Sequence, residues 1–277
     1  MKNGVFGGWR HGIASILAVF GFMGHVAHAW AQDSCQRLYV AGRYSEAIRC
    51  WTLLAEQGVA LAQYNLGVMY YDNGQGVPKD YAKALYWFTK AAEQGDAEAQ
   101  SNLGWMYLNG QGVPKDYAKA LYWSQKAAER GVALAQSNLG VMYLNGQGVP
   151  KDYAKALYYF TKAAERGVAE AQYNLGVMYD NGQGVPKDYK KAIYWYRKAA
   201  EQGDAEAQNN LGAMYYDNGQ GVHKDYAKAL YWFTKAAEQG DAEAQSNLGM
   251  MYLNGQGVPR DEKKARYWME RSQRGGR

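Results

Sequence analysis

A segment of 36 or 37 residues recurs six times along this 277-residue chain. The leucine of its Leu-Gly step marks each copy, at Leu66, Leu103, Leu139, Leu175, Leu211 and Leu248. Repeats of this length are typical of solenoids, in which each supersecondary unit buries its apolar faces only against its neighbours. The periodicity therefore argues against a globule built around one central core.

The copy that contains Leu103 begins with a predicted helix. Ala99, Leu103 and Tyr107 are four residues apart, which places them on one helical face. Gly104 lies beside Leu103, where the missing side chain would allow a neighbouring helix to approach closely. Gly110 follows within Asn-Gly-Gln-Gly and can take the left-handed conformation that ends a helix.

A second helix is predicted to follow in the same copy. Asp116 can accept a backbone hydrogen bond as its N-cap. The helix would present Ala120, Trp123 and Ala127 as its apolar face, and Gly131 would end it. Each copy is therefore a helical hairpin with one apolar face per helix.

The residues of the repeat also resemble a known family. The pattern Ala-x-x-x-Leu-Gly-x-x-Tyr, then Gly-x-Gly-Val-x-x-Asp, then Lys-Ala-x-x-Trp-x-x-Lys-Ala-Ala is similar to the Sel-one-like repeat, a relative of the tetratricopeptide repeats. The resemblance covers about residues 59–274, and His223 replaces a proline that the other copies have. It implies an all-α solenoid wound as a right-handed superhelix, with the first helix of each hairpin on the concave face.

About seven hairpins are expected, at residues 33–57, 59–94, 96–130, 132–166, 168–202, 204–239 and 241–274. We expect residues 32–58 to form an N-terminal capping hairpin and residues 59–277 to form the repeat solenoid. In the cap, Cys50 occupies the place of Trp87, which the pattern assigns to the core. A bridge from Cys50 to Cys35 would then replace the lost aromatic packing.

Residues 1–31 have the order of a secretory signal peptide. Lys2 and Arg10 precede a mostly apolar run, and small residues surround the expected cleavage point after Ala31. A membrane anchor is the alternative, although the run is short for a span of ~20 residues. Cleavage would release residues 32–277 into the periplasm or the medium, without stable membrane insertion.

Export would place both cysteines in an oxidising compartment, where a pair is normally bridged. Cys35 lies seven residues before Gly42 and Cys50 eight residues after it, so a hairpin that turns at Gly42 brings them to the same height. A disulfide between Cys35 and Cys50 is therefore predicted. A reactive thiol is the alternative, but no histidine lies nearby to activate it.

The chain is poor in the residues that catalysis and metal binding require. Of four histidines, only His223 lies outside the predicted signal peptide, in a turn. This excludes the familiar nucleophile–histidine arrangements and zinc sites with several histidine ligands. The net charge of +5 comes from interspersed residues of both signs, which is unlike a nucleic-acid binder. We expect no catalytic residues, no metal and no cofactor.

Comparison of the copies separates packing positions from free ones on the first helices. One variable slot holds Tyr64, Ser101, Ser137, Tyr173, Asn209 and Ser246. A second slot holds Val68, Trp105, Val141, Val177, Ala213 and Met250, and a third holds Leu61, Glu98, Leu134, Glu170, Glu206 and Glu243. Because tyrosine and tryptophan are common anchors of interfaces, Tyr64, Trp105 and Tyr173 are the candidate contacts, with Trp105 expected to be exposed.

An unvarying row of asparagines runs between these slots: Asn65, Asn102, Asn138, Asn174, Asn210 and Asn247. Amides donate and accept hydrogen bonds, so the row could hold the backbone of an extended peptide. Alternatively, each asparagine bonds to the neighbouring hairpin and sets the stacking angle. Both interpretations stay open at this point.

These patterns predict an exported, monomeric, non-enzymatic scaffold that binds a partner protein or peptide on its concave face. One alternative is a penicillin-recognising, β-lactamase-like envelope hydrolase, which some cysteine-rich relatives suggest. This chain has only one cysteine pair and no Ser-x-x-Lys element. Another alternative is a binder of glycans or peptidoglycan fragments that uses Trp105 and nearby tyrosines.

Overall fold

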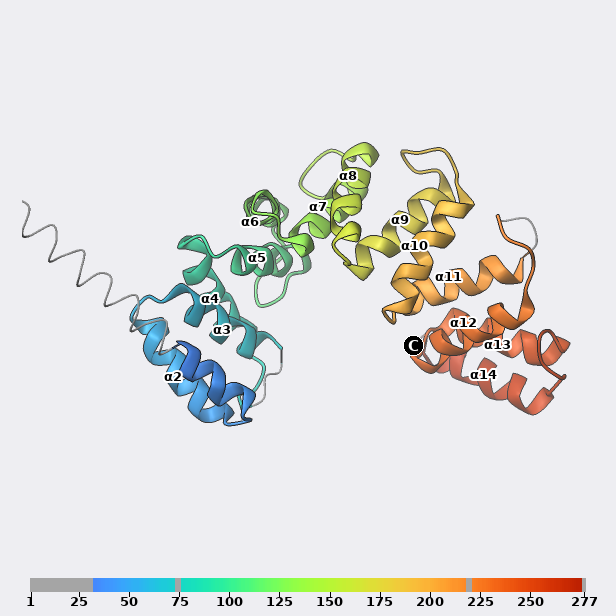
Figure 1. Ribbon diagram of the computed structural model, residues 1–277, viewed down its shortest axis with the longest axis horizontal. Coiled ribbons are helices and arrows are strands. Elements are labelled where there is room, and N and C mark those ends of the chain that lie inside the picture. Colours follow the sequence, from blue (N-terminus) through green and yellow to red (C-terminus); the bar gives the residue numbers. More distant parts are fainter. Residues whose placement is uncertain (1–31, 73–75, 218–220, 276–277) are drawn as a thin grey trace, which may run out of the picture. The chain divides into compact units, whose positions relative to one another are not determined.

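The computed structural model describes residues 32–72, 76–217 and 221–275. These residues form helices joined by turns, with no strand among them, so the predicted all-α class is confirmed (Figure 1). The chain divides into two compact units, Met1–Lys126 (unit 1) and Ala127–Arg277 (unit 2).

The described helices pair into seven hairpins, as the repeats predict. Residues 32–40 are helical and precede α2 (Tyr44–Glu56). The next pairs are α3 (Ala60–Tyr71) with α4 (Tyr81–Glu93), and α5 (Ala97–Asn109) with α6 (Tyr117–Glu129), which crosses the division between the units. Unit 2 continues with α7 (Ala133–Asn145), α8 (Tyr153–Glu165), α9 (Ala169–Asn181), α10 (Tyr189–Glu201), α11 (Ala205–Tyr216), α12 (Tyr226–Glu238), α13 (Ala242–Asn254) and α14 (Glu262–Gly275).

We call the odd-numbered helices α3–α13 the first helices and the even-numbered helices α4–α14 the second helices. Within unit 2, α11 packs against α12 of its own hairpin and against α10 of the preceding one. The first helices of successive hairpins also contact one another, as α9 contacts α7 and α11. Each second helix is therefore packed mainly against first helices.

The turns form where the sequence predicts them. Gly110 ends α5 with a φ of 72°, in the left-handed conformation that glycine adopts at little cost. Asp116 then accepts a hydrogen bond from the Lys119 amide at 3.0 Å, as the predicted N-cap of α6.

Each hairpin closes where the glycine of the Leu-Gly step meets a second-helix side chain. A Cβ atom built on Gly176 would lie 2.4 Å from the Tyr196 ring, and one on Gly212 would lie 2.7 Å from the Phe233 ring. The close approach expected at Gly104 is confirmed, and its partner is Ser124. A β-carbon at these places would force the two helices apart.

One sequence-based assignment of the second helix is wrong. The pattern places Trp123 and its copies in the core, but Trp123 is only partly buried, at the edge of the cluster around Leu103. The buried stripe of α6 is instead Ala120, Ser124 and Ala127. Trp123 is one residue, and thus about 100°, away from the centre of that stripe. The corresponding buried residues of the other second helices in the repeats are Phe88, Phe160, Tyr196 and Phe233.

Buried glutamines join successive hairpins. Gln172 of α9 is 3% exposed and donates its side-chain amide to the carbonyl of Ala164, at the end of α8. Its oxygen accepts a 2.7 Å hydrogen bond from Gln202, after α10. Gln63, Gln100, Gln208 and Gln245 donate to the preceding hairpin in the same way, each at 3.0 Å. Each of these carbonyls also accepts from the backbone amide of the glycine that follows its helix, so the glutamine is a second donor, contributed by the next hairpin.

The predicted disulfide is present in the N-terminal hairpin. Cys35 and Cys50 are bonded, with their Cα atoms 5.5 Å apart, and Cys35 is fully buried. The expected loss of aromatic packing is wrong, however. Trp51, the next residue, is 2% exposed and occupies the place that Phe88 fills in the following hairpin. The bridge therefore adds to a complete core.

The predicted signal peptide, residues 1–31, lies outside the described residues. None of the described helices combines the length and the apolarity needed to cross a bilayer.

Candidate functional site

The surface that the repeats leave variable lies on the first helices, and we call it the first-helix face. Its most exposed slot holds Leu61, Glu98, Leu134, Glu170, Glu206 and Glu243. Leu61 and Leu134 are 51% and 55% exposed, and all of the glutamates except Glu170 are exposed. The first helices contain no lysine or arginine, so the slot is acidic and apolar in character.

In unit 1, Tyr64 joins two first helices at this face. Its ring lies 6.0 Å from that of Phe88, and its hydroxyl accepts a hydrogen bond from the side chain of Asn102 on α5. Burial raises the pKa of Tyr64, and the negative charges of Glu98 and Asp96 raise it further. Tyr64 is thus half-buried and holds α3 to α5.

Tyr173 repeats this arrangement in unit 2. Its ring lies 6.0 Å from that of Tyr196, and its hydroxyl bonds with Asn210 and Glu206 of α11. Burial, followed by the charge of Glu206, raises the pKa of Tyr173. Its phenol therefore stays protonated and donates to the carboxylate.

Trp105 does not lie exposed as the sequence predicts. It is partly buried, and its indole N–H donates to the hydroxyl of Tyr71 on α3. Tyr71 in turn donates to Gln111 at 2.5 Å. A tryptophan in this slot reaches back to the preceding hairpin because the slot faces the junction between two first helices.

The slot of Tyr64 is also less open than the variation of its residues suggests. Ser101, Ser137 and Asn209 are each at most 3% exposed, whereas Tyr64 and Tyr173 are partly exposed and Ser246 is exposed. The small residues fill narrow gaps between helices, so the variation there reflects packing.

The structure gives several members of the asparagine row partners within the stack. Asn102 and Asn210 bond to the two tyrosines above, and Asn247 donates to Asn209 at 3.2 Å. Asn174 donates to the Glu170 carbonyl of its own helix at 2.9 Å. Asn138 is 4% exposed and Asn65 is partly buried. A ligand-binding role for the row stays a prediction.

Three carboxyl groups gather where α9 meets α11. Glu170 is partly buried, and burial followed by the charges of Asp204 and Glu206 raises its pKa. Burial also raises the pKa of Asp204, against the hydrogen bond that this residue accepts from the Ala207 amide as N-cap. Among the described residues, none of the three forms an ion pair with a basic side chain. This part of the first-helix face carries unbalanced negative charge.

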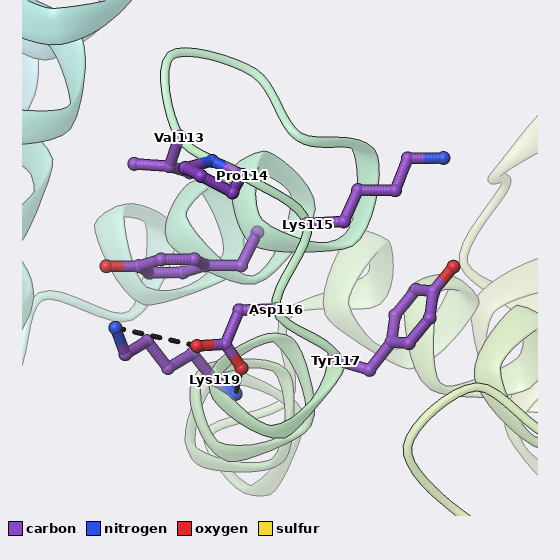
Figure 2. A pocket seen from close by; sticks show the side chains of 7 residues that line it. Val113, Pro114, Lys115, Asp116, Tyr117 and Lys119 are labelled. Carbon is purple, nitrogen blue, oxygen red and sulfur yellow. Dashed lines mark hydrogen bonds and ion pairs between the residues drawn. The ribbon is translucent and has the colours of Figure 1, made fainter.

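A cavity of about 480 Å³ lies at the turn between α5 and α6, lined by Tyr107, Val113, Pro114, Lys115, Asp116, Tyr117 and Lys119. Figure 2 shows Lys119 reaching Asp116, whose carboxylate lies 3.5 Å from the ammonium group. The same ammonium lies 5.1 Å from the centre of the Tyr107 ring. Equivalent contacts recur in other repeats, as between Lys191 and Tyr179. The cavity therefore belongs to the turn that every repeat needs.

The described residues contain no group of three or more potential metal ligands, and His223 lies exposed in its turn.

Sequence reasoning missed two sets of residues. The buried glutamines stand beside the alanine ridge and could have been found from their invariance among the copies. The other set is a row of exposed tyrosines. Each of them lies on a second helix, on the side of that helix opposite to its buried stripe.

The profile of the Sel1 repeat family matches residues 60–96, 97–132, 133–168, 169–204, 205–241 and 242–274. Of the solved structures, a Sel1 repeat protein from Oxalobacter formigenes is 36% identical, with a TM-score of 0.77. The match covers 87% of this chain and 96% of that one. A putative Sel1 repeat protein from Klebsiella pneumoniae is 28% identical over 73% of this chain and 97% of its own, with a TM-score of 0.51.

A protective antigen present in uropathogenic Escherichia coli strains, which displays an SLR fold, is 42% identical with a TM-score of 0.72. The match covers 83% of this chain but 49% of the E. coli protein, so the chain spans about half the length of that relative. No protein of curated function matches the sequence at a significant level.

Proposed function

Because the chain belongs to the Sel1 repeat family, we propose that it is an exported scaffold that binds a partner protein or peptide on the first-helix face. Sel1 repeat proteins are generally non-catalytic scaffolds that bind other proteins. The observation that carries the proposal for this chain is the exposed slot of leucines and glutamates on helices that contain no basic residue.

Charge and shape suggest what such a partner presents. The exposed leucines of this slot offer apolar contact, and the glutamates offer charge-assisted hydrogen bonds. The carboxyl cluster at Glu170, Asp204 and Glu206 would be relieved of its mutual repulsion by a cation. A partner segment with lysine or arginine beside an apolar residue fits both requirements.

The disulfide supports export, because bridged cysteines persist mainly in oxidising compartments. The relative from E. coli is described as a protective antigen, a description that agrees with a location outside the cytoplasm. The periplasm and the extracellular medium are both open to this proposal.

Affinity capture from envelope extract, followed by titration with the captured partner, tests the proposal. The informative variant changes Glu98 and Glu243 to Lys, because both are exposed and neither is one of the hydrogen-bond partners of Tyr64 and Tyr173 described above. A matched control changes Glu129 and Glu201, which are exposed on second helices, to Lys. We expect the first variant to weaken binding at least tenfold and the control to bind like the unchanged chain. Equal binding by both variants would place the interface elsewhere.

A further inference from the structure

Each second helix from α4 to α14 presents one tyrosine to the solvent. These residues are Tyr86, Tyr122, Tyr158, Tyr194, Tyr231 and Tyr267, and each is 49–54% exposed. We call them the tyrosine row. Among the aromatic and methionine side chains of the described helices, only these six tyrosines and Met250 are exposed.

Packing of the stack does not require these tyrosines. On α12, Tyr231 precedes the buried Phe233 by two residues, which places the two side chains about 200° apart around the helix. The position that packs against the glycine of the Leu-Gly step varies among the copies, from phenylalanine to Ser124, Tyr196 and Met269, while the exposed position is tyrosine in all six. An apolar surface that the core does not use is a candidate for contact with a ligand.

The rings are held in place from two sides. The Tyr231 ring meets Trp232 edge to face, with centroids 4.8 Å apart and an interplanar angle of 79°. The ammonium group of Lys235, one turn later, lies 5.3 Å from the centre of the same ring. Every copy has such a cation, at Lys90, Lys126, Lys162, Lys198, Lys235 and Arg271. Each hairpin thus offers a rigid aromatic ring beside a positive charge.

We propose that the tyrosine row and its cations bind an anionic polysaccharide, at a surface separate from the first-helix face. Pyranose rings present C–H groups that pack on aromatic rings, while a carboxylate or phosphate on the sugar pairs with the neighbouring ammonium or guanidinium. One ring and one cation recur per hairpin, in unit 1 at two successive hairpins and in unit 2 at four. This regular recurrence fits a polymer of repeating units.

The acidic residues of the second helices favour a polymer over a lipid surface. Glu93, Glu129, Glu165, Glu201 and Glu238 are exposed, seven residues after the tyrosine of their helix. Seven residues correspond to two turns on the same face, about 10 Å along the axis. A continuous anionic membrane would meet these carboxylates, whereas a single polymer chain that crosses the helices at the tyrosines would not.

Titration of the full chain with polygalacturonate, phosphomannan and uncharged dextran tests the proposal. The test variant changes Tyr158, Tyr194, Tyr231 and Tyr267 to Ala, and its helicity is checked by circular dichroism. We expect at least one anionic polysaccharide to bind, dextran not to bind, and the variant to bind at least tenfold more weakly. Changing the same four tyrosines to Phe keeps the rings and should cost less than threefold.

Two charge variants test the proposal even if the alanine variant does not fold. Changing Lys162, Lys198 and Lys235 to Gln should weaken binding and reduce its dependence on salt. Changing Glu165, Glu201 and Glu238 to Gln, on the same three helices, should strengthen it. The proposal would be overturned if dextran bound as tightly as the anionic polysaccharides, or if neither anionic polysaccharide bound. It would also be overturned if the tyrosine and lysine variants bound like the unchanged chain. Tighter, tyrosine-dependent binding to phosphatidylglycerol vesicles or to oligo(dT) would overturn it as well.

Discussion

Gly140 lies so close to the Phe160 ring that a Cβ atom built on it would be 2.5 Å from Cδ1 of that ring. The two residues belong to the two helices of one hairpin, so the absent side chain sets the distance between α7 and α8. The same relationship recurs along the chain with different partners, which allows its energetic weight to be measured by comparing copies.

We expect Gly140→Ala to lower the free energy of unfolding by about 1–2 kcal/mol. Overpacking of this kind costs about 1–3 kcal/mol, and the higher helix propensity of alanine offsets up to about 1 kcal/mol. Gly104→Ala is the comparison, because its nearest neighbour is the Ser124 hydroxyl, which can rotate away. Denaturant unfolding that shows no greater loss at Gly140 than at Gly104 would contradict this account.

The glutamine bonds between hairpins give a second prediction. Gln172→Ala should destabilise unit 2 by about 1–3 kcal/mol, since it removes both hydrogen bonds of this buried side chain, at about 0.5–1.5 kcal/mol each. Gln136→Ala is the matched control, because Gln136 reaches the Ala128 carbonyl only at 3.5 Å. Thermal unfolding should show the larger loss for Gln172, and equal losses would mean that the bond length does not matter.

The disulfide should stabilise the N-terminal hairpin. Reduction, or changing Cys35 and Cys50 to Ala, should cost about 3 kcal/mol for a loop of this length, in the chain-entropy model. Hydrogen exchange should speed up in residues 32–40 and in α2, while α9–α14 of unit 2 keep their protection. Uniform acceleration over all helices would show instead that the bridge stabilises the whole chain at once.

Stability should rise as the pH falls from 7 towards 5. The pKa values of Glu170 and Asp204 are raised in the folded chain, so the fold binds more protons there than the unfolded chain does. At a pH below the pKa values that these groups have in the unfolded chain, about 4, this gain in stability is complete. Further acidification then lowers the stability through Asp80, Asp116 and Asp225. Their pKa values are lowered, chiefly by backbone amides at the helix starts, so their stabilisation is lost on acidification.

Glu170→Gln tests the origin of this dependence. The neutral amide should raise Tm at pH 7, and the difference from the unchanged chain should vanish near pH 4. Glu201→Gln, at an exposed position on α10, serves as the control. If Glu170→Gln shifts Tm by the same amount at both pH values, the cluster is not the titrating element.

Much of the fold was predictable because the repeat makes each local signal appear several times. Gly110 as helix end, Asp116 as N-cap and Gly104 as a point of close approach are decided by backbone conformation and by the absence of a side chain. Such properties belong to one residue and its near neighbours. The candidate binding residues were less predictable, because the exposure of Trp105 depends on a hydrogen bond to another hairpin.

The sequence by itself determined the all-α class, the number of hairpins, their turns and the pairing of Cys35 with Cys50. These follow from periodicity, from glycine and aspartate at helix ends and from the height of two residues in one hairpin. Only the tertiary structure decided that Phe88, Ser124, Phe160, Tyr196 and Phe233 are buried rather than the aromatic residue that precedes each of them. It also decided that glutamines join the hairpins and that Tyr64 and Tyr173 bond to the next first helix. Helical periodicity predicts which face of a helix is apolar, but in this fold two faces of each helix are covered, by different neighbouring helices. Which side chain lies at the centre of a contact and which lies at its edge depends on how those neighbours are placed.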